Sequence, residues 1–131
     1  LSSRLKISKK GIFENNLIKV EIEPSQIPWL KIFTQEPIKE FSMCDKHLKQ
    51  MIWEATDIIE KQMLQYFQCD KINIASFGNY MPHVHFHIMS RFKNDNYFPE
   101  PMWGEQQRDN NLVLPPLEPF YNAVALNLRS L

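Results

Sequence analysis

The segment HVHFHIMSR, residues 83–91, alternates histidine with apolar residues and constrains the fold more than any other part of the chain. Successive side chains of a β-strand point to opposite faces of a sheet, so His83, His85 and His87 should share one face. The apolar residues of the other face are Val84, Phe86 and Ile88. Such a strand needs a hydrophobic layer on one side and holds neighbouring imidazoles about 6–7 Å apart on the other.

Other segments predict the partners of this strand. Residues 17–23 and 29–35 alternate apolar and polar side chains across the short turn PSQIP, which predicts an antiparallel pair. Shorter strands are expected around residues 12–13 and over residues 70–77. The pattern SMCD at 42–45 has the form of a helix start, and apolar residues at three-and-four spacing then predict about six helical turns. The sequence therefore predicts an α+β domain with an antiparallel sheet of about five strands and one long helix.

Composition limits the classes of partner. The 131 residues suit one domain, and 15 basic residues balance 15 acidic ones, so long nucleic acids are not expected as partners. No apolar run is long enough to span a bilayer and no signal peptide is recognised, so a cytoplasmic protein without membrane contact is expected. Cys44 and Cys69 lack the spacing of a redox pair or a metal finger. The charged segment KNDN at 93–96 has the composition of a solvated turn.

Three interpretations of the histidines remain open from the residues alone. They could form an exposed polar face, although three alternating histidines among the four in the chain make that an unusual coincidence. They could bind zinc or another transition metal, although no nearby carboxylate or cysteine clearly completes a site. In the third interpretation one imidazole attacks phosphorus while its neighbours manage charge and proton transfer, which requires several histidines and no metal.

The chain resembles the histidine triad family from about Leu17 to Trp103. The shared features are paired strands with a Pro-containing turn, a long helix, a further strand, a Gly-Asn turn, the HVHFHIM strand and then FPEPMW. The stretch DKINIASFGNYMPHVHFHIMSRF is most similar to a bacterial branch whose members are often labelled diadenosine polyphosphate hydrolases. The resemblance implies a homodimer with a continuous two-subunit sheet. Trp53 and Tyr66, beside the core-facing side of the helix, favour such an interface.

The resemblance also implies a role for each histidine. His85, the middle one, matches the nucleophile that attacks the α-phosphate of a bound nucleotide and forms a nucleotidyl-histidine intermediate. His87 matches the residue that faces the leaving-group oxygen and can donate a proton to it. His83 matches the residue that braces the hydrogen bonds behind the phosphate. This chemistry uses no cofactor and no metal.

Substrate-binding residues are expected around the histidines. Gly78 permits a backbone that approaches an anion closely, and Asn79 carries two N–H donors for phosphate oxygens. Trp103 matches a tryptophan that lies near the active site in related proteins, although it could equally be a rim aromatic that covers the core. We therefore expect these three residues to contact the substrate, Gly78 through its backbone.

The chain departs from many relatives around the second strand of the pair. Thr34 and Gln35 occupy the place of an arginine or a proline-lysine pair, and only Glu23 could replace an acidic residue that contacts the ribose.

The expected function is that of a nucleotide hydrolase or transferase that separates a nucleoside monophosphate from its leaving group. The leaving group could belong to a dinucleoside polyphosphate, a phosphoramidate or an acyl-nucleotide. The alternatives are a nucleotide-binding regulatory module with little turnover and a metal-binding protein. Residues 1–110 are expected to form the triad domain, and residues 111–131 a Pro-containing tail that docks on it or on a second subunit.

Overall fold

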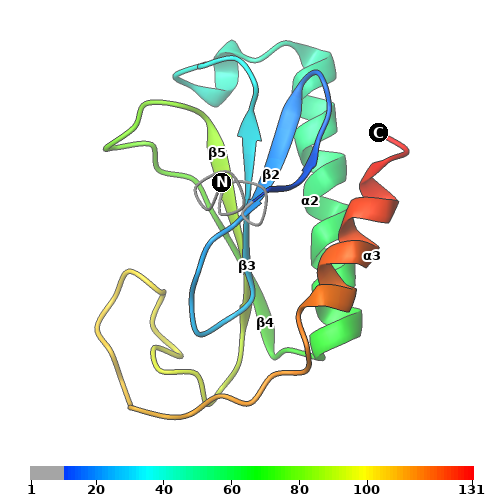
Figure 1. Ribbon diagram of the computed structural model, residues 1–131. Helices are drawn as coiled ribbons and strands as arrows, with labels where there is room; N and C mark the ends of the chain where they lie inside the picture. Colours follow the sequence, from blue (N-terminus) through cyan, green and yellow to red (C-terminus); the bar gives the residue numbers. More distant parts are fainter. Residues whose placement is uncertain (1–10) are drawn as a thin grey trace, which may run out of the picture.

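The computed structural model describes residues 11–131, which form one antiparallel sheet with two helices packed against one of its faces (Figure 1). The strand order is β1-β2-β3-β5-β4. The strands are β1 (Gly11–Glu14), β2 (Ile18–Ile22), β3 (Trp29–Thr34), β4 (Lys71–Ala75) and β5 (His85–Arg91). The sheet of five strands and the long helix confirm the predicted α+β fold class.

Strand β5 lies between β3 and β4 and is antiparallel to both. The prediction placed its start at His83, which is two residues too early. The N–H of His83 donates to the carbonyl of Met81 and the N–H of Val84 to the carbonyl of Ile38. Because these donors serve a turn and a loop, regular pairing with β3 begins at His85, opposite Phe33.

The long helix α2 (Lys46–Phe67) begins at Asp45, whose carboxylate accepts a 2.8 Å hydrogen bond from the N–H of Leu48. The predicted start at Ser42 was therefore wrong, because residues Phe41–Met43 form a separate 3₁₀ turn, η1. The helix ends at Gln68, which adopts a left-handed conformation with φ of 50°. Among residues 11–131 no helix combines the length and apolar character needed to cross a membrane.

The hydrophobic core lies between the sheet and α2. The alternation predicted for the histidine strand is confirmed, because its apolar side chains are buried beneath the helix while the histidines occupy the opposite face. The buried core residues of the sheet are Ile18, Val20, Leu30, Ile32, Ile72, Val84, Phe86 and Ile88, and those of α2 are Leu48, Met51, Ile52, Ala55, Ile59, Met63 and Phe67.

The C-terminal segment adds a second helix, which the sequence analysis did not predict. After an extended Pro-containing stretch, α3 (Glu118–Leu128) packs against α2 and reaches β1. Phe120 is fully buried with its ring centroid 4.8 Å from that of Phe67, and the hydroxyl of Tyr66 donates a 2.7 Å hydrogen bond to the carbonyl of Pro116. Tyr66 is therefore occupied within its own chain.

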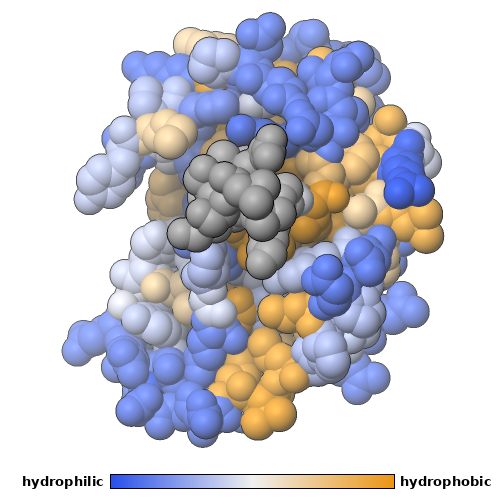
Figure 2. All heavy atoms as spheres, viewed as in Figure 1, coloured by the Kyte–Doolittle hydropathy of each residue, from blue (hydrophilic) through white to orange (hydrophobic). Residues whose placement is uncertain are grey.

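Figure 2 shows a face on which hydrophilic residues predominate, with hydrophobic residues along the side where α3 lies and in a patch near the bottom of the view. Leu126, on the outer face of α3, is 62% exposed. The helix thus buries one side in the core and leaves the other in solvent.

We expect Phe120→Ala to lower the free energy of unfolding by about 3–5 kcal/mol, because it removes a fully buried aromatic ring shared by two helices. Leu126→Ala on the same helix is the matched control and should change stability by no more than about 0.5 kcal/mol. Urea denaturation monitored by circular dichroism measures both. Equal effects of the two substitutions would show that α3 does not belong to the core.

Candidate functional site

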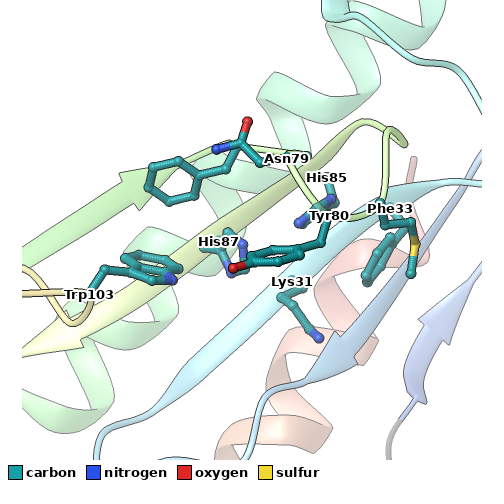
Figure 3. A pocket seen from close by; sticks show the side chains of 10 residues that line it. Lys31, Phe33, Asn79, Tyr80, His85, His87 and Trp103 are labelled. Atoms are coloured by element: carbon teal, nitrogen blue, oxygen red, sulfur yellow. The ribbon is translucent and has the colours of Figure 1, made fainter.

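A cavity of about 420 Å³ lies over the histidine face of β3 and β5. Its walls come from these two strands, from the loop between β4 and β5, and from the loop after β5 (Figure 3). The lining residues are Lys31, Phe33, Phe77, Gly78, Asn79, Tyr80, Met81, His85, His87 and Trp103. The cavity thus brings together two of the predicted histidines, both turn residues and the predicted tryptophan, but not His83 or Glu23.

His85 is held in one tautomer by its own strand. Its Nδ1 lies 2.8 Å from the carbonyl oxygen of His83. Because a carbonyl only accepts hydrogen bonds, Nδ1 must carry the proton, and Nε2 keeps a free lone pair. The ring of Phe33 stacks on this imidazole with the centroids 5.1 Å apart. The geometry therefore leaves His85 Nε2 as a base or nucleophile in a ring of fixed orientation.

His87 is held in the opposite tautomer. The indole Nε1 of Trp29 donates a 3.0 Å hydrogen bond to His87 Nδ1. Because an indole N–H only donates, Nδ1 must be unprotonated, and the neutral ring carries its proton on Nε2. His87 is only 8% exposed. His87 is thus a hydrogen-bond donor to whatever occupies the cavity.

Burial lowers the pKa of His87 from 6.5 to about 4, because the charged imidazolium loses its solvation. His85 and Lys31 act in the same direction as neighbouring positive charges, and Glu23 acts against them. His87 is therefore neutral near pH 7 in the free protein.

His83 does not line the cavity but braces the strand beneath it. Its Nε2 lies 2.7 Å from the carbonyl oxygen of Thr34, so Nε2–H donates there, and the Thr34 hydroxyl oxygen is 3.0 Å away. The Thr34 hydroxyl in turn donates to the carbonyl of Glu36 at 2.7 Å. Thr34, which departs from the family pattern in the sequence, therefore fixes the orientation of the His83 ring.

Glu23 lies outside the cavity lining and forms an ion pair with Lys31, with a 2.7 Å distance between its Oε1 and the Lys31 Nζ. The sequence analysis missed Lys31, which lines the cavity and pairs in register with His87. The alternation of WLKIFT could have revealed it. Trp29, Lys31 and Phe33 share the face opposite the buried Leu30 and Ile32, which is the histidine face.

The loop after β5 is built on a buried ion pair, so the prediction of a plain solvated turn at 93–96 was wrong. Arg91 is 1% exposed and Asp95 is fully buried, with Nε and Oδ2 3.0 Å apart. Asp95 also accepts hydrogen bonds from the backbone N–H groups of Phe92, Tyr97 and Phe98. These bonds and the guanidinium lower the pKa of Asp95 despite its burial.

This loop carries Trp103 to the cavity. The guanidinium of Arg91 donates a 2.7 Å hydrogen bond to the carbonyl of Glu100, three residues before Trp103. The Trp103 ring lies edge-on to His87, Trp29 and Phe77, with centroid distances of 5.0, 5.2 and 4.7 Å. Trp103 is thus part of the aromatic wall beside His87.

Gly78 adopts φ of +71°, a conformation that other residues rarely take. A Cβ there would also approach the Met81 carbonyl oxygen to 3.4 Å. The glycine allows the turn that brings Asn79 and Tyr80 over the histidines (Figure 3).

Within residues 11–131, no group of three or more His, Cys, Asp or Glu side chains is arranged to hold a metal ion. His83 engages Thr34 rather than converging with the other two histidines.

Comparisons with known proteins place this architecture among histidine triad proteins. A family model described as HIT domain matches residues 6–94. A histidine triad protein from Bradyrhizobium japonicum is 27% identical, with a TM-score of 0.75 over 98% of this chain and 96% of that one. A histidine triad protein from Marinobacter aquaeolei is 24% identical, with a TM-score of 0.75 over 98% of this chain and 95% of that one. No curated protein matches the chain.

The sheet, the long helix and the two cavity-lining histidines define an architecture of the histidine triad type. The chain belongs to the histidine triad family, whose domain model covers most of its length. Members of this family are in general nucleotide hydrolases or transferases, although some are not catalytic.

We expect the free energy of unfolding to fall as the pH decreases from about 6.5 to about 4. The unfolded chain takes up a proton on residue 87 near pH 6.5, whereas the folded protein resists protonation until about pH 4, so the unfolded state binds more protons in this window. The contribution approaches about 3 kcal/mol. Urea denaturation at several pH values measures it.

His87→Asn should flatten this part of the pH dependence. His47→Asn, which replaces an exposed histidine at the start of α2, is the matched control and should keep the wild-type slope. An unchanged slope in His87→Asn would show that residue 87 is not the group responsible.

Proposed function

We propose that this protein is a nucleotide hydrolase or transferase that cleaves a nucleoside monophosphate from its leaving group through a nucleotidyl-His85 intermediate. The observation that carries the proposal is the hydrogen bond between His85 Nδ1 and the His83 carbonyl. It assigns the proton to Nδ1 and leaves the lone pair of Nε2 on an imidazole that lines the cavity.

The first step forms a bond between His85 Nε2 and the α-phosphorus as the bond from phosphorus to the leaving group breaks. The phosphorylated ring becomes cationic and retains its Nδ1 proton, which the His83 carbonyl stabilises. Water then attacks phosphorus, the nitrogen–phosphorus bond breaks, and nucleoside monophosphate and a proton are released. Another acceptor in place of water gives transfer rather than hydrolysis.

The cavity contains donors suited to the oxygens that gain charge in this step. His87 offers Nε2–H, Asn79 offers a side-chain amide, and Lys31 supplies a positive charge on the adjacent strand. The aromatic side chains of Phe33, Phe77 and Trp103 give the same cavity apolar walls suited to a base or a leaving group. Glu23 acts on the substrate through Lys31, to which it is paired, rather than on a ribose.

A regulatory module that binds nucleotides with little turnover is the second candidate. Both candidates share the cavity, and they differ in whether His85 reacts. The lone pair on Nε2 favours the enzyme, because binding alone does not require it.

His85→Ala should lower turnover by several orders of magnitude and retain binding of nucleoside monophosphate, because the covalent route is lost while the cavity remains. His47→Ala is the control. It changes an exposed histidine on the long helix and should keep wild-type turnover. Hydrolysis of a dinucleoside polyphosphate and calorimetric binding of the monophosphate measure the two effects. Turnover of His85→Ala within tenfold of wild type would refute the assignment.

A metal chelator provides a further control on the same assay. Treatment should leave wild-type turnover nearly unchanged, because the proposed step uses only imidazole and hydrogen-bond donors. A large loss that zinc restores would favour the metal-binding alternative.

We further propose a homodimer. Trp53 on α2 is 51% exposed and packs its ring on Phe41 and Phe86, with centroids 5.4 and 5.6 Å away. Met43 in η1 is 64% exposed. This apolar surface on α2 and η1 supports the pairing that the family resemblance implies.

Sedimentation at micromolar concentration should give twice the chain mass of 15.6 kDa. Trp53→Glu should shift the mass toward the monomer, because it places a charge on the apolar surface. Lys61→Glu, on an exposed position of the same helix, is the control and should not change the mass. A wild-type species at the monomer mass would refute the homodimer.

A further inference from the structure

Trp29 lies at the first position of β3, and its partly buried indole reaches the last of the three histidines. Its Nε1 is 3.0 Å from His87 Nδ1, and the two rings meet edge-on with centroids 5.6 Å apart. Trp103 approaches the same imidazole at 5.0 Å but donates no hydrogen bond to it among the described contacts. Of these two tryptophans, it is therefore Trp29 that determines which ring nitrogen of His87 carries the proton.

The hydrogen-bonding capacities of the Trp29 indole and the His87 imidazole allow one protonation state of His87. An indole nitrogen has no acceptor capacity, so a proton on His87 Nδ1 would place two N–H groups against each other. The doubly protonated imidazolium would also carry this proton, so Trp29 opposes the charged form as well as the other tautomer. A neutral imidazole with its proton on Nε2 remains, and it is a hydrogen-bond donor but not a useful acid.

We propose that Trp29 is a positioning residue that holds His87 as the neutral Nε2–H tautomer, so that the site favours leaving groups that depart as anions. The inference rests on the proposed function and deepens it, because it selects among the leaving groups that the sequence left open.

The electron balance of the first step explains the preference. When the bond from phosphorus to the leaving group breaks, its electron pair goes to the leaving atom. A phosphate or carboxylate oxygen accepts that pair as a stable anion, which needs only the hydrogen bond from His87 Nε2–H. The nitrogen of a phosphoramidate must gain a proton as it leaves, and a neutral His87 does not supply one.

The charged and titratable groups around His87 agree with an anionic leaving group. They are His85 on β5, Lys31 on β3, Glu23 beyond β2, and Tyr80 on the cavity rim. Lys31 pairs in register with His87 and keeps a positive charge on the cavity floor, partly balanced by Glu23. A departing anion is therefore stabilised by a cation and a neutral donor, and no proton has to move.

The first experiment reads the tautomer directly. Nitrogen-15 NMR of labelled protein distinguishes protonated from unprotonated ring nitrogens, and the wild type should show His87 protonated at Nε2 only at pH 7. Trp29→Phe should introduce the Nδ1–H tautomer and raise the pKa of His87, while burial and the neighbouring charges of His85 and Lys31 still hold it below 6.5. Trp103→Phe, which removes the other neighbouring indole, should leave the tautomer unchanged.

The second experiment measures the preference of the site for one leaving group over another. At pH 6 a pKa of about 4 leaves roughly 1% of His87 charged, and each unit by which the variant raises that pKa increases the charged share about tenfold. We expect the wild type to cleave diadenosine tetraphosphate in preference to adenosine phosphoramidate at this pH. In Trp29→Phe, the turnover of the phosphoramidate relative to the polyphosphate should rise by about tenfold or more.

The possible outcomes separate this inference from the proposed function. A wild type that forms nucleotidyl-His85 yet prefers the phosphoramidate overturns the inference and leaves the proposed function standing. Failure to form the intermediate from either substrate overturns the proposed function and the leaving-group preference with it. A proton on His87 Nδ1 in the wild type refutes the role of Trp29 even if Trp29→Phe does not fold, because that measurement needs no variant and no activity.

Discussion

The pairing of β5 with β3 is the constraint on which the site depends. Its register sets His85 opposite Phe33 and His87 opposite Lys31, so that the stacking ring, the cation and both cavity-lining imidazoles share one face. A shift by one residue would send the histidines into the core and Phe86 and Ile88 into solvent. Burial of these apolar side chains beneath α2 opposes that shift, and so the hydrophobic core also fixes the positions of the His85 and His87 rings.

The alternation of apolar and polar residues and the three-and-four spacing of apolar residues were enough to predict the sheet, the long helix and the face on which the histidines lie. Alternation reports the face of a strand directly, and three-and-four spacing reports the buried side of a helix. The predicted starts of α2 and β5 were wrong because single hydrogen bonds decide them. These are the bond to the Asp45 cap and the bonds from the N–H groups of His83 and Val84 to loop carbonyls. The helix α3 was missed because prolines dominate its approach, although its buried residues Phe120, Val124 and Leu128 recur every four positions.

Of the cavity lining, the sequence predicted His85, His87, Gly78, Asn79 and Trp103, but not the residues that hold the histidines in place. Trp29 holds His87 and Thr34 holds His83, which lie 58 and 49 residues away in sequence, and no local pattern marks such pairs. Asp95 lay in a charged segment typical of a solvated turn, yet its carboxylate is buried beside Arg91. Burial of that carboxylate is possible because the guanidinium and three backbone N–H groups replace its water. The same network supports the loop that bears Trp103.

The two cavity histidines have opposite tautomers because their Nδ1 atoms face opposite kinds of partner. A carbonyl that only accepts faces His85, and an indole that only donates faces His87. Identical side chains two positions apart therefore present a lone pair and an N–H to the same cavity. That difference gives one ring the capacity to attack phosphorus and the other the capacity to hold an oxygen. Because burial lowers the pKa of His87 to about 4, its ring stays neutral at pH 7 and keeps the N–H that faces the cavity.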